Sequence, residues 1–324
     1  MNVDTMSTRT GERLPDPQQK NFGVKLKKLL KNIWRFKALY LMLIPGLITV
    51  FIFHYIPLYG VQIAFRNYRT SKGILGSEWV GLKYFIKFVE YPYFWDIIRN
   101  TVWISIVSLA TFPCSVIFAL MLNEMKDGKL KKICQQLTYA PHFVSTVVVC
   151  AMAVLFLNRD GLINILLGLF GVEPVDFMSK PAAFAPIYAI TGLWSNLGWG
   201  TIMYLASLSN VSPELIEAAK IDGANRFQII RNVNWPHLKP TVIMVFILEL
   251  GKVLNVGFEK VFLLQNPLNM EASNVISTYT YQLGIMGQQF SYSAAVGLFN
   301  NVVTIILVVL ANKISNKVAK TGLW

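Results

Sequence analysis

The sequence is poor in charged residues for its length. Only 15% of its 324 residues are Asp, Glu, Lys or Arg, whereas 54% are hydrophobic. A soluble domain carries about 25% charged residues. The apolar runs are roughly 20 residues long, which suits a helix that crosses a bilayer and exceeds the ~10 residues of a barrel strand. The composition therefore predicts an all-α integral membrane protein.

Cysteine and histidine are also scarce, with three of each. The cysteines fall in or beside apolar runs and the histidines are far apart, so we expect neither a disulfide framework nor a metal site. No G-x-x-x-x-G-K-[ST] run occurs, so the chain is not expected to bind ATP phosphates. The net charge of +13 does not indicate nucleic-acid binding, because the basic residues cluster at the ends of apolar runs.

Six apolar runs are expected to span the membrane. They cover residues 38–65, 97–122, 133–157, 182–208, 240–264 and 293–312. The segments on the side of both termini hold 20 Lys and Arg, and the three loops on the other side hold 8. The positive-inside rule therefore predicts that both termini lie in the cytoplasm.

The remaining segments are polar. Residues 1–22 are expected to form a disordered cytoplasmic tail, and 23–37 a basic amphipathic helix on the lipids of the inner leaflet. The membrane domain covers 38–312 and includes a cytoplasmic loop at 210–239, and 313–324 form a second cytoplasmic tail.

The loop 210–239 carries strong helix signals at its start. Ser212 is expected to cap a helix and Pro213 suits its first position, whereas Asp222-Gly223 is a stop signal because glycine readily adopts a left-handed conformation. We therefore predict a short helix over Pro213–Ile221. A second helix is expected to begin at Asn225 and to end before Pro236.

The spacing within this loop carries a resemblance. The loop resembles the EAA signature of permease subunits from binding-protein-dependent ABC importers. The resemblance rests on Glu217-Ala218-Ala219, followed after three residues by Gly223 and after nine more by Val233-x-x-Pro236. Val233 and Trp235 replace the commoner Ile and Leu. Other segments look like the polysaccharide (LplB-like) branch, which includes alginate permeases: Leu43-Ile44-Pro45-Gly46, Phe53-His54-Tyr55-Ile56-Pro57-Leu58-Tyr59-Gly60 and Tyr139-Ala140-Pro141-His142-Phe143.

The resemblance implies a type I importer permease fold with six transmembrane helices and a cytoplasmic EAA coupling helix in a bacterial cytoplasmic (inner) membrane. It implies four kinds of partner: a second, different permease subunit, two ATP-binding subunits that hold ATP and Mg, an extracytoplasmic solute-binding protein and an oligo- or polysaccharide. Glu217 would be the coupling carboxylate. The residues that carry the coupling pattern are Glu217, Ala218, Ala219, Asp222, Gly223 and Pro236. A basic first external loop is compatible with an acidic, alginate-like sugar, but the sequence does not fix the sugar.

Polar residues within the spans are candidates for the transport path. In the fifth span they fall within one arc of a helix face, and they line either the path or the contact with the partner permease: Glu249, Lys252, Asn255 and Glu259. Asn196 and Trp199 in the fourth span suit a sugar, although close packing through glycines explains them slightly better. Asn300 is a weaker candidate. Hydroxyl groups share a face of the second span, where helix contact is favoured over substrate binding: Thr101, Ser105, Ser108 and Ser115.

Two other functional classes remain open. A membrane-embedded hydrolase would use Glu249, Glu259 or a histidine, but no paired carboxylates or nucleophile motif stand at active-site spacing. A membrane scaffold would tolerate replacement of Glu217 without loss of flux. Turnover by the purified chain alone favours the hydrolase, and ATP-dependent uptake that requires added ATPase subunits favours a non-catalytic pore subunit.

Overall fold

The computed structural model describes residues 31–32, 34–252, 254 and 256–319. Its internal contacts divide the chain into two units, Met1–Val61 and Gln62–Trp324. The predicted tail at 1–22 and most of the predicted amphipathic helix at 23–37 lie outside the described residues.

The first unit is helical from α2 onward. Helix α2 (Lys37–Val50) continues through a π-helical turn η1 (Phe51–Tyr55) into α3 (Ile56–Leu58), and the 3-10 turn η2 (Tyr59–Phe65) leads on into the second unit. The hydroxyl of Thr49 donates to the carbonyl oxygen of Pro45 (2.9 Å). No residue of α2 or α3 is buried. A helix that is apolar on all sides is suited to lipid or to another subunit.

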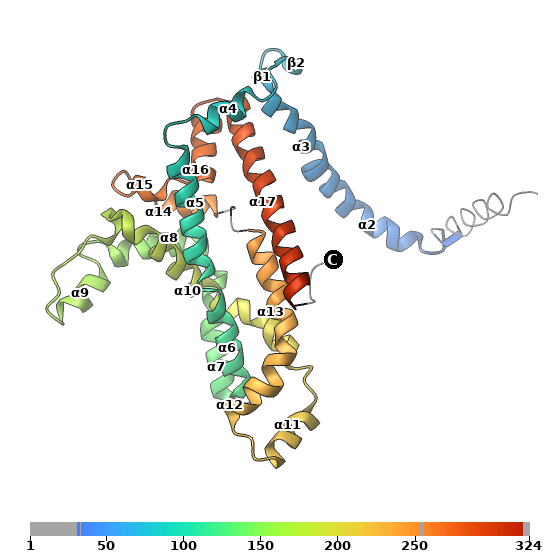
Figure 1. The fold of residues 1–324 in the computed structure, drawn as a ribbon, viewed down its shortest axis with the longest axis vertical. Coiled ribbons are helices and arrows are strands. Elements are labelled where there is room, and N and C mark those ends of the chain that lie inside the picture. The colour runs from blue at the N-terminus through green and yellow to red at the C-terminus, as the bar shows by residue number, and fades with distance from the viewer. Residues whose placement is uncertain (1–30, 33, 253, 255, 320–324) are drawn as a thin grey trace, which may run out of the picture. The chain divides into compact units, whose positions relative to one another are not determined.

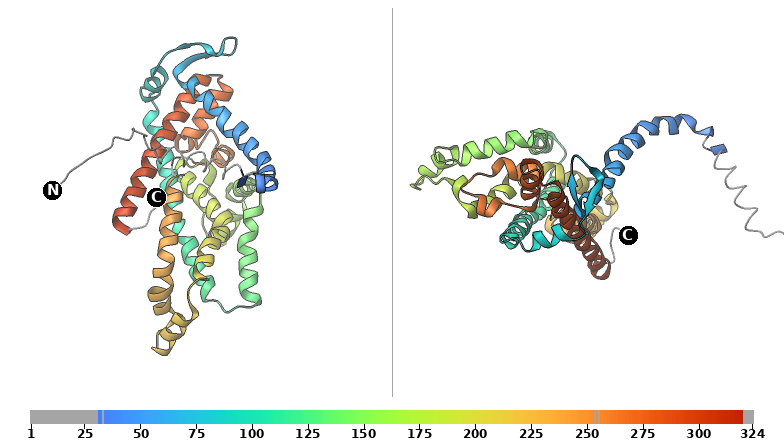
Figure 2. Two further views of the ribbon diagram at one scale, coloured as in Figure 1. Left: turned by 90° about the vertical axis from the view of Figure 1, so that its right-hand side faces the viewer. Right: turned by 90° about the horizontal axis from the view of Figure 1, so that it is seen from above.

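The second unit begins with an antiparallel hairpin of β1 (Arg66–Arg69) and β2 (Gly73–Trp79). Helices α4 (Lys83–Val89), α5 (Phe94–Leu109) and α6 (Phe112–Glu124) follow. The hairpin and α11 (Pro213–Ile221) lie at opposite ends of this unit's long axis (Figures 1 and 2). Aromatic rings from α4, α5, α16 (Ile276–Tyr281) and α17 (Phe290–Ala319) fill the core near the hairpin, including Phe88, Phe94, Tyr279 and Tyr292.

The predicted span at 133–157 is not one helix. Helix α7 (Lys129–Tyr139) passes into a 3-10 turn η3 (Ala140–Phe143), and α8 (Thr146–Leu157) begins afresh. Val144 is extended, and Ser145 caps α8 by accepting from the backbone amide of Val148 (3.4 Å). Pro141 lies in this turn and supplies no N–H to it, and the single helix expected over 133–157 is broken here.

Helix α10 (Phe184–Leu208) lies at the centre of the second unit and confirms the fourth predicted run as a continuous helix. It follows α9 (Leu162–Gly168) and two 3-10 turns, η4 (Phe177–Ser179) and η5 (Pro181–Ala183). It packs against α5, α6, α7 and α13. Tyr204 and Leu208 of α10 join Val116, Ala119 and Leu238 in one core cluster. Because α10 packs mainly on other helices, its side chains can be less hydrophobic than those of a helix that faces lipid.

The predicted span at 240–264 is interrupted as well. Helix α13 (Trp235–Leu250) begins five residues earlier than predicted and ends at Gly251, and a separate helix α14 (Phe258–Leu264) starts after Gly257. Two glycines within this stretch, Gly251 and Gly257, weaken the helix. Short α15 (Met270–Ser273) and α16 (Ile276–Tyr281) follow, then the π-helical turn η7 (Gln282–Met286) and the long α17 (Phe290–Ala319).

Within the described part of the chain, four segments are long and apolar enough to cross a membrane: Lys37–Phe65, Phe94–Glu124, Thr146–Gly168 and Phe290–Lys313. Three of them cover the first, second and sixth predicted runs, whereas Thr146–Gly168 covers only the second half of the predicted run at 133–157. The helical class is confirmed, whereas the count of six is not reproduced by length and composition. Helix α10 contains polar side chains such as Asn196, and the break after α13 leaves two helices that are each too short.

Candidate functional site

Helix α11 (Pro213–Ile221) has the predicted bounds. Its end is closed by two backbone bonds, from the amide of Gly223 to the carbonyl of Lys220 (3.1 Å) and from the amide of Ala224 to the carbonyl of Ala219 (2.9 Å). This Schellman arrangement requires a left-handed residue, and Gly223 has φ 78°. The predicted role of Ser212 is wrong in one respect, because its side chain makes no cap bond although its backbone is extended.

The second helical segment starts where the sequence predicts and ends elsewhere. Asn225 and Gln228 form a reciprocal capping box at the start of α12 (Arg226–Ile229). Helical backbone then continues through the π-helical turn η6 (Ile230–Asn234) into α13. The prediction that Pro236 ends this helix is wrong, because helical backbone continues from the π-helical turn η6 through Pro236, the second residue of α13.

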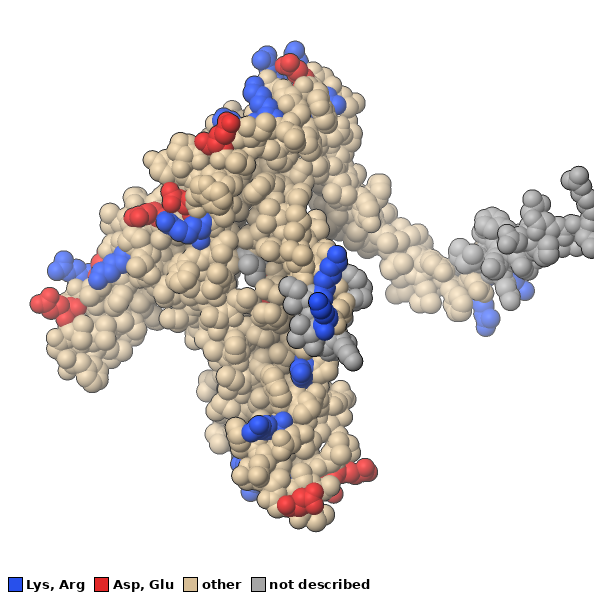
Figure 3. All heavy atoms as spheres, viewed as in Figure 1, with Lys and Arg blue, Asp and Glu red and all other residues tan. Residues whose placement is uncertain are grey.

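The end of the molecule formed by α11 is exposed and acidic. No residue of α11 is buried, and Leu215, Ile221 and Phe227 are 59%, 86% and 69% exposed. Figure 3 shows acidic side chains gathered at this end. Glu217 and Ala218 are exposed, and Ala219 is half-buried. Glu217 forms no ion pair with any residue that the structure describes.

A cavity of about 560 Å³ opens between α5, α6, α10, α13 and α14. Four of the predicted path residues line it: Asn196, Trp199, Glu249 and Lys252. Of the others, Glu259 is exposed in the first turn of α14, Asn300 is buried and donates to the carbonyl of Leu254 (3.4 Å), and neither lines the cavity. Asn255 lies outside the described residues. The predicted arc of the fifth span assumes one helix, so it does not extend past the break at Gly251.

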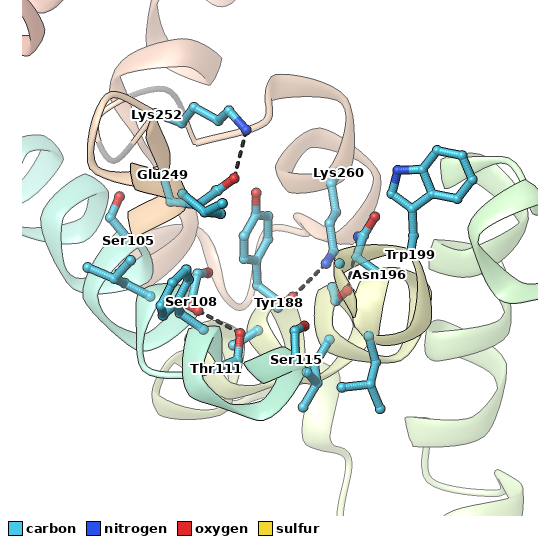
Figure 4. A pocket seen from close by; sticks show the side chains of 18 of the residues that line it. Ser105, Ser108, Thr111, Ser115, Tyr188, Asn196, Trp199, Glu249, Lys252 and Lys260 are labelled. Atoms are coloured by element: carbon cyan, nitrogen blue, oxygen red, sulfur yellow. Dashed lines mark hydrogen bonds and ion pairs between the residues drawn. The ribbon is translucent and has the colours of Figure 1, made fainter. Parts of the chain in front are cut away.

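Charged groups face the cavity from the end of α13 and from α14. Lys252 Nζ lies 2.8 Å from Glu249 Oε1. Lys260 Nζ donates to the carbonyl oxygen of Tyr188 (2.6 Å) and lies 4.3 Å from the centre of the Tyr188 ring. The hydroxyl of Tyr188 accepts from the amide of Gly257 (3.1 Å). In Figure 4 Tyr188 stands between the Glu249–Lys252 pair and Lys260.

Sequence reasoning missed Tyr188 and Lys260. Lys260 carries a detectable signal, because it is an ionisable residue inside the predicted fifth span. Tyr188 carries none, since one tyrosine in an apolar helix is ordinary. Three of the four hydroxyl residues predicted on one face of the second span also line the cavity, namely Ser105, Ser108 and Ser115, together with Thr111. Thr101 instead accepts from the amide of Ile276 (3.1 Å), which is the helix-contact role favoured above.

An aromatic stack lies at the edge of the cavity. The rings of His142 and Trp199 are parallel within 5°, with centroids 4.3 Å apart, and Phe143 meets Trp199 edge-on. His142 Nδ1 lies 3.1 Å from Asn196 Oδ1, and Asn196 Nδ2 donates to the carbonyl of Gly192 (3.0 Å). The turn η3 thus fixes both α10 side chains that the sequence singled out.

A cavity that holds ammonium, carboxylate, amide and aromatic groups inside a helical protein with apolar spans is typical of a membrane transport component. Residues 111–318 match the family described as "Binding-protein-dependent transport system inner membrane component", and the chain belongs to this family.

Several of the proteins that the chain resembles are named for polysaccharide transport. The chain is 42% identical to the polygalacturonan/rhamnogalacturonan transport system permease protein YteP of Bacillus subtilis (strain 168), over 93% of this chain and 94% of that protein. It is 42% identical to protein LplB of the same organism, over 90% and 92%. Among solved structures it resembles a bacterial ABC transporter that imports the acidic polysaccharide alginate, with TM-score 0.82, 36% identity and coverage of 90% and 99%. A second alginate transporter structure, in complex with an alginate pentasaccharide-bound periplasmic protein, has TM-score 0.82, 37% identity and coverage of 91% and 100%. The chain is thus similar to ABC importer permeases along nearly its full length.

Proposed function

We propose that this chain is the pore subunit of an ATP-driven importer of oligo- or polysaccharides that contain uronic acids. The observation that carries this proposal is the cavity, in which an aromatic stack, an amide and two lysines surround one space in a chain of this family. Aromatic faces suit the C–H faces of sugar rings, amides suit their hydroxyls, and lysines suit carboxylates. Polygalacturonan and alginate, named for the relatives, are polymers of such acids.

The proposed assembly contains a second, different permease subunit, two ATP-binding subunits that hold ATP and Mg, and an extracytoplasmic binding protein that delivers the sugar. The chain itself is non-catalytic, and both of its termini lie in the cytoplasm. Helix α11 would dock on an ATP-binding subunit through its exposed apolar side chains and the carboxylate of Glu217. Two properties support this role: α11 buries no residue within the chain, and Glu217 lacks an ion pair among the described side chains.

Reconstitution of the whole importer in proteoliposomes tests the transport role. We expect ATP-dependent uptake of trigalacturonate or of an alginate trisaccharide when the loaded binding protein is supplied. Uptake that persists without ATP-binding subunits, or turnover of the sugar by this chain alone, would contradict a pore subunit.

The coupling role is tested by Glu217→Lys, with Glu214→Gln on the same exposed helix as the control. Because Glu217 makes no ion pair within the described chain, the variant should fold and assemble, yet its ATP hydrolysis should no longer respond to the loaded binding protein. The Glu214→Gln variant should respond as the wild type does. Full stimulation of the Glu217→Lys complex would exclude this role.

A further inference from the structure

Lys260 lines the cavity and has no Asp or Glu partner among the residues that the structure describes. Its Nζ bonds to the Tyr188 carbonyl oxygen and lies over the Tyr188 ring. A methyl group at Gly192 would lie 2.9 Å from this nitrogen, so the ammonium is closely packed against α10. No Asp or Glu oxygen of the described chain comes within 4.0 Å of it.

The two lysines of the cavity differ in this respect. Lys252 is neutralised by Glu249 at 2.8 Å, whereas Lys260 has only a carbonyl dipole and a ring face. An ammonium group has three donors, and charge removed from water is costly unless it is paired. The groups that line the cavity therefore carry one positive charge in excess, located at Lys260.

The residues around Lys260 suit the uncharged part of an acidic sugar, its ring and its hydroxyl groups. Asn196 and Trp199, one turn apart on α10, line the same cavity and lie beside Lys260 in Figure 4. Trp199 is 46% exposed, and His142 stacks on its ring. An anionic group on an otherwise hydroxylated ring would thus meet a cation, an amide and an aromatic edge within one space.

We propose that Lys260 pairs with the carboxylate of a uronic acid unit as the sugar passes through the cavity, and so selects acidic over neutral sugars. This assignment rests on the proposed transport function. It gives Lys260 a specificity role, whereas Lys252 remains the partner of Glu249.

The test compares trigalacturonate with its fully methyl-esterified form, which has the same rings without charge. Uptake into proteoliposomes is measured for the complete importer at concentrations of each probe that saturate the binding protein. Lys260→Gln removes the charge but keeps an N–H donor for the Tyr188 carbonyl. We expect roughly tenfold or greater loss of trigalacturonate uptake, since bonds to charged groups are the strong ones. Uptake of the methyl ester and assembly of the complex should be unchanged.

Lys87→Met is the matched control. Lys87 Nζ also lies over a tyrosine ring, at 4.5 Å from the centre of Tyr292, but Lys87 is exposed and does not line the cavity. This variant should transport both probes as the wild type does.

Three results would overturn the assignment. Equal loss of both probes in Lys260→Gln, or loss of subunit co-purification, would show a structural role or a partner-subunit ion pair instead. Unchanged uptake of trigalacturonate would show that the charge is not used. These outcomes in Lys260→Gln leave the proposed transport function standing. A wild-type complex that imports neither probe would reject that function and this assignment together.

Discussion

Replacement of Gly198 by alanine should loosen the contact between α10 and the segment that precedes α8. A Cβ at Gly198 would lie 2.3 Å from the carbonyl oxygen of Thr138 and 2.6 Å from Cδ1 of Tyr139. An ordinary contact between carbon and a carbonyl oxygen is about 3.3 Å, so the backbone must separate by roughly 1 Å. The obstacle is a main-chain atom, which cannot rotate away as a flexible side chain can.

Two opposing effects decide the magnitude. Alanine gains up to about 1 kcal/mol of helix propensity over glycine, whereas overpacking costs typically 1–3 kcal/mol and rises when backbone must shift. We expect net destabilisation of about 1–2 kcal/mol, or a drop of several degrees in the Tm of the purified complex. The same displacement should disturb the stack of His142 on Trp199, the next residue of α10, and lower uptake.

Gly297→Ala in α17 is the control for this prediction, because a Cβ there comes within 4 Å of no other segment that the structure describes. It should leave the Tm unchanged or raise it through helix propensity. If Gly198→Ala has the Tm of the wild type and Gly297→Ala does too, the close approach of α7 and η3 to α10 is not a feature of the folded protein.

Three further predictions concern single residues. Lys252→Met leaves Glu249 unpaired and should reduce assembly of the complex. The double variant Lys252→Met/Glu249→Gln should restore assembly. Normal uptake and assembly in Lys252→Met alone would remove any path role for this lysine. Asn269→Asp replaces an amide that donates to the carbonyls of Met178 and Leu264 (both 3.1 Å) and should cost about 1–3 kcal/mol; an unchanged Tm would refute this. Gly223→Ala forces a left-handed alanine at a cost of about 1 kcal/mol, so the last amides of α11 should exchange hydrogen roughly fivefold faster, and equal exchange would contradict the Schellman arrangement.

The parts of the molecule that the sequence predicts correctly depend on local signals. The bounds of α11 and the start of α12 follow from Pro213, Gly223 and Asn225, each of which acts on the few residues beside it. The continuous helix α10 follows from a long apolar run, and its three glycines, Gly192, Gly198 and Gly200, do not interrupt it.

The breaks in the third and fifth runs were not predicted, because they depend on contacts between distant segments. Apolar composition persists across Ser145 and Gly251, and composition alone cannot show where packing favours two short helices over one. The cavity depends on such contacts too. Tyr188 lines it because its hydroxyl and carbonyl bind Gly257 and Lys260, about 70 residues further along the chain.

The unbroken helical path from Arg226 to Leu250 has a mechanical consequence. At ~1.5 Å per residue this rod is about 37 Å long, and it joins the exposed end of the protein directly to Glu249. Used as a lever, it would convert a tilt of roughly 5° at α12 into a displacement of about 3 Å at the cavity. Glu249 and Lys252 lie together at this end of the rod, so the displacement would carry their ion pair as a unit past the α10 residues that line the cavity.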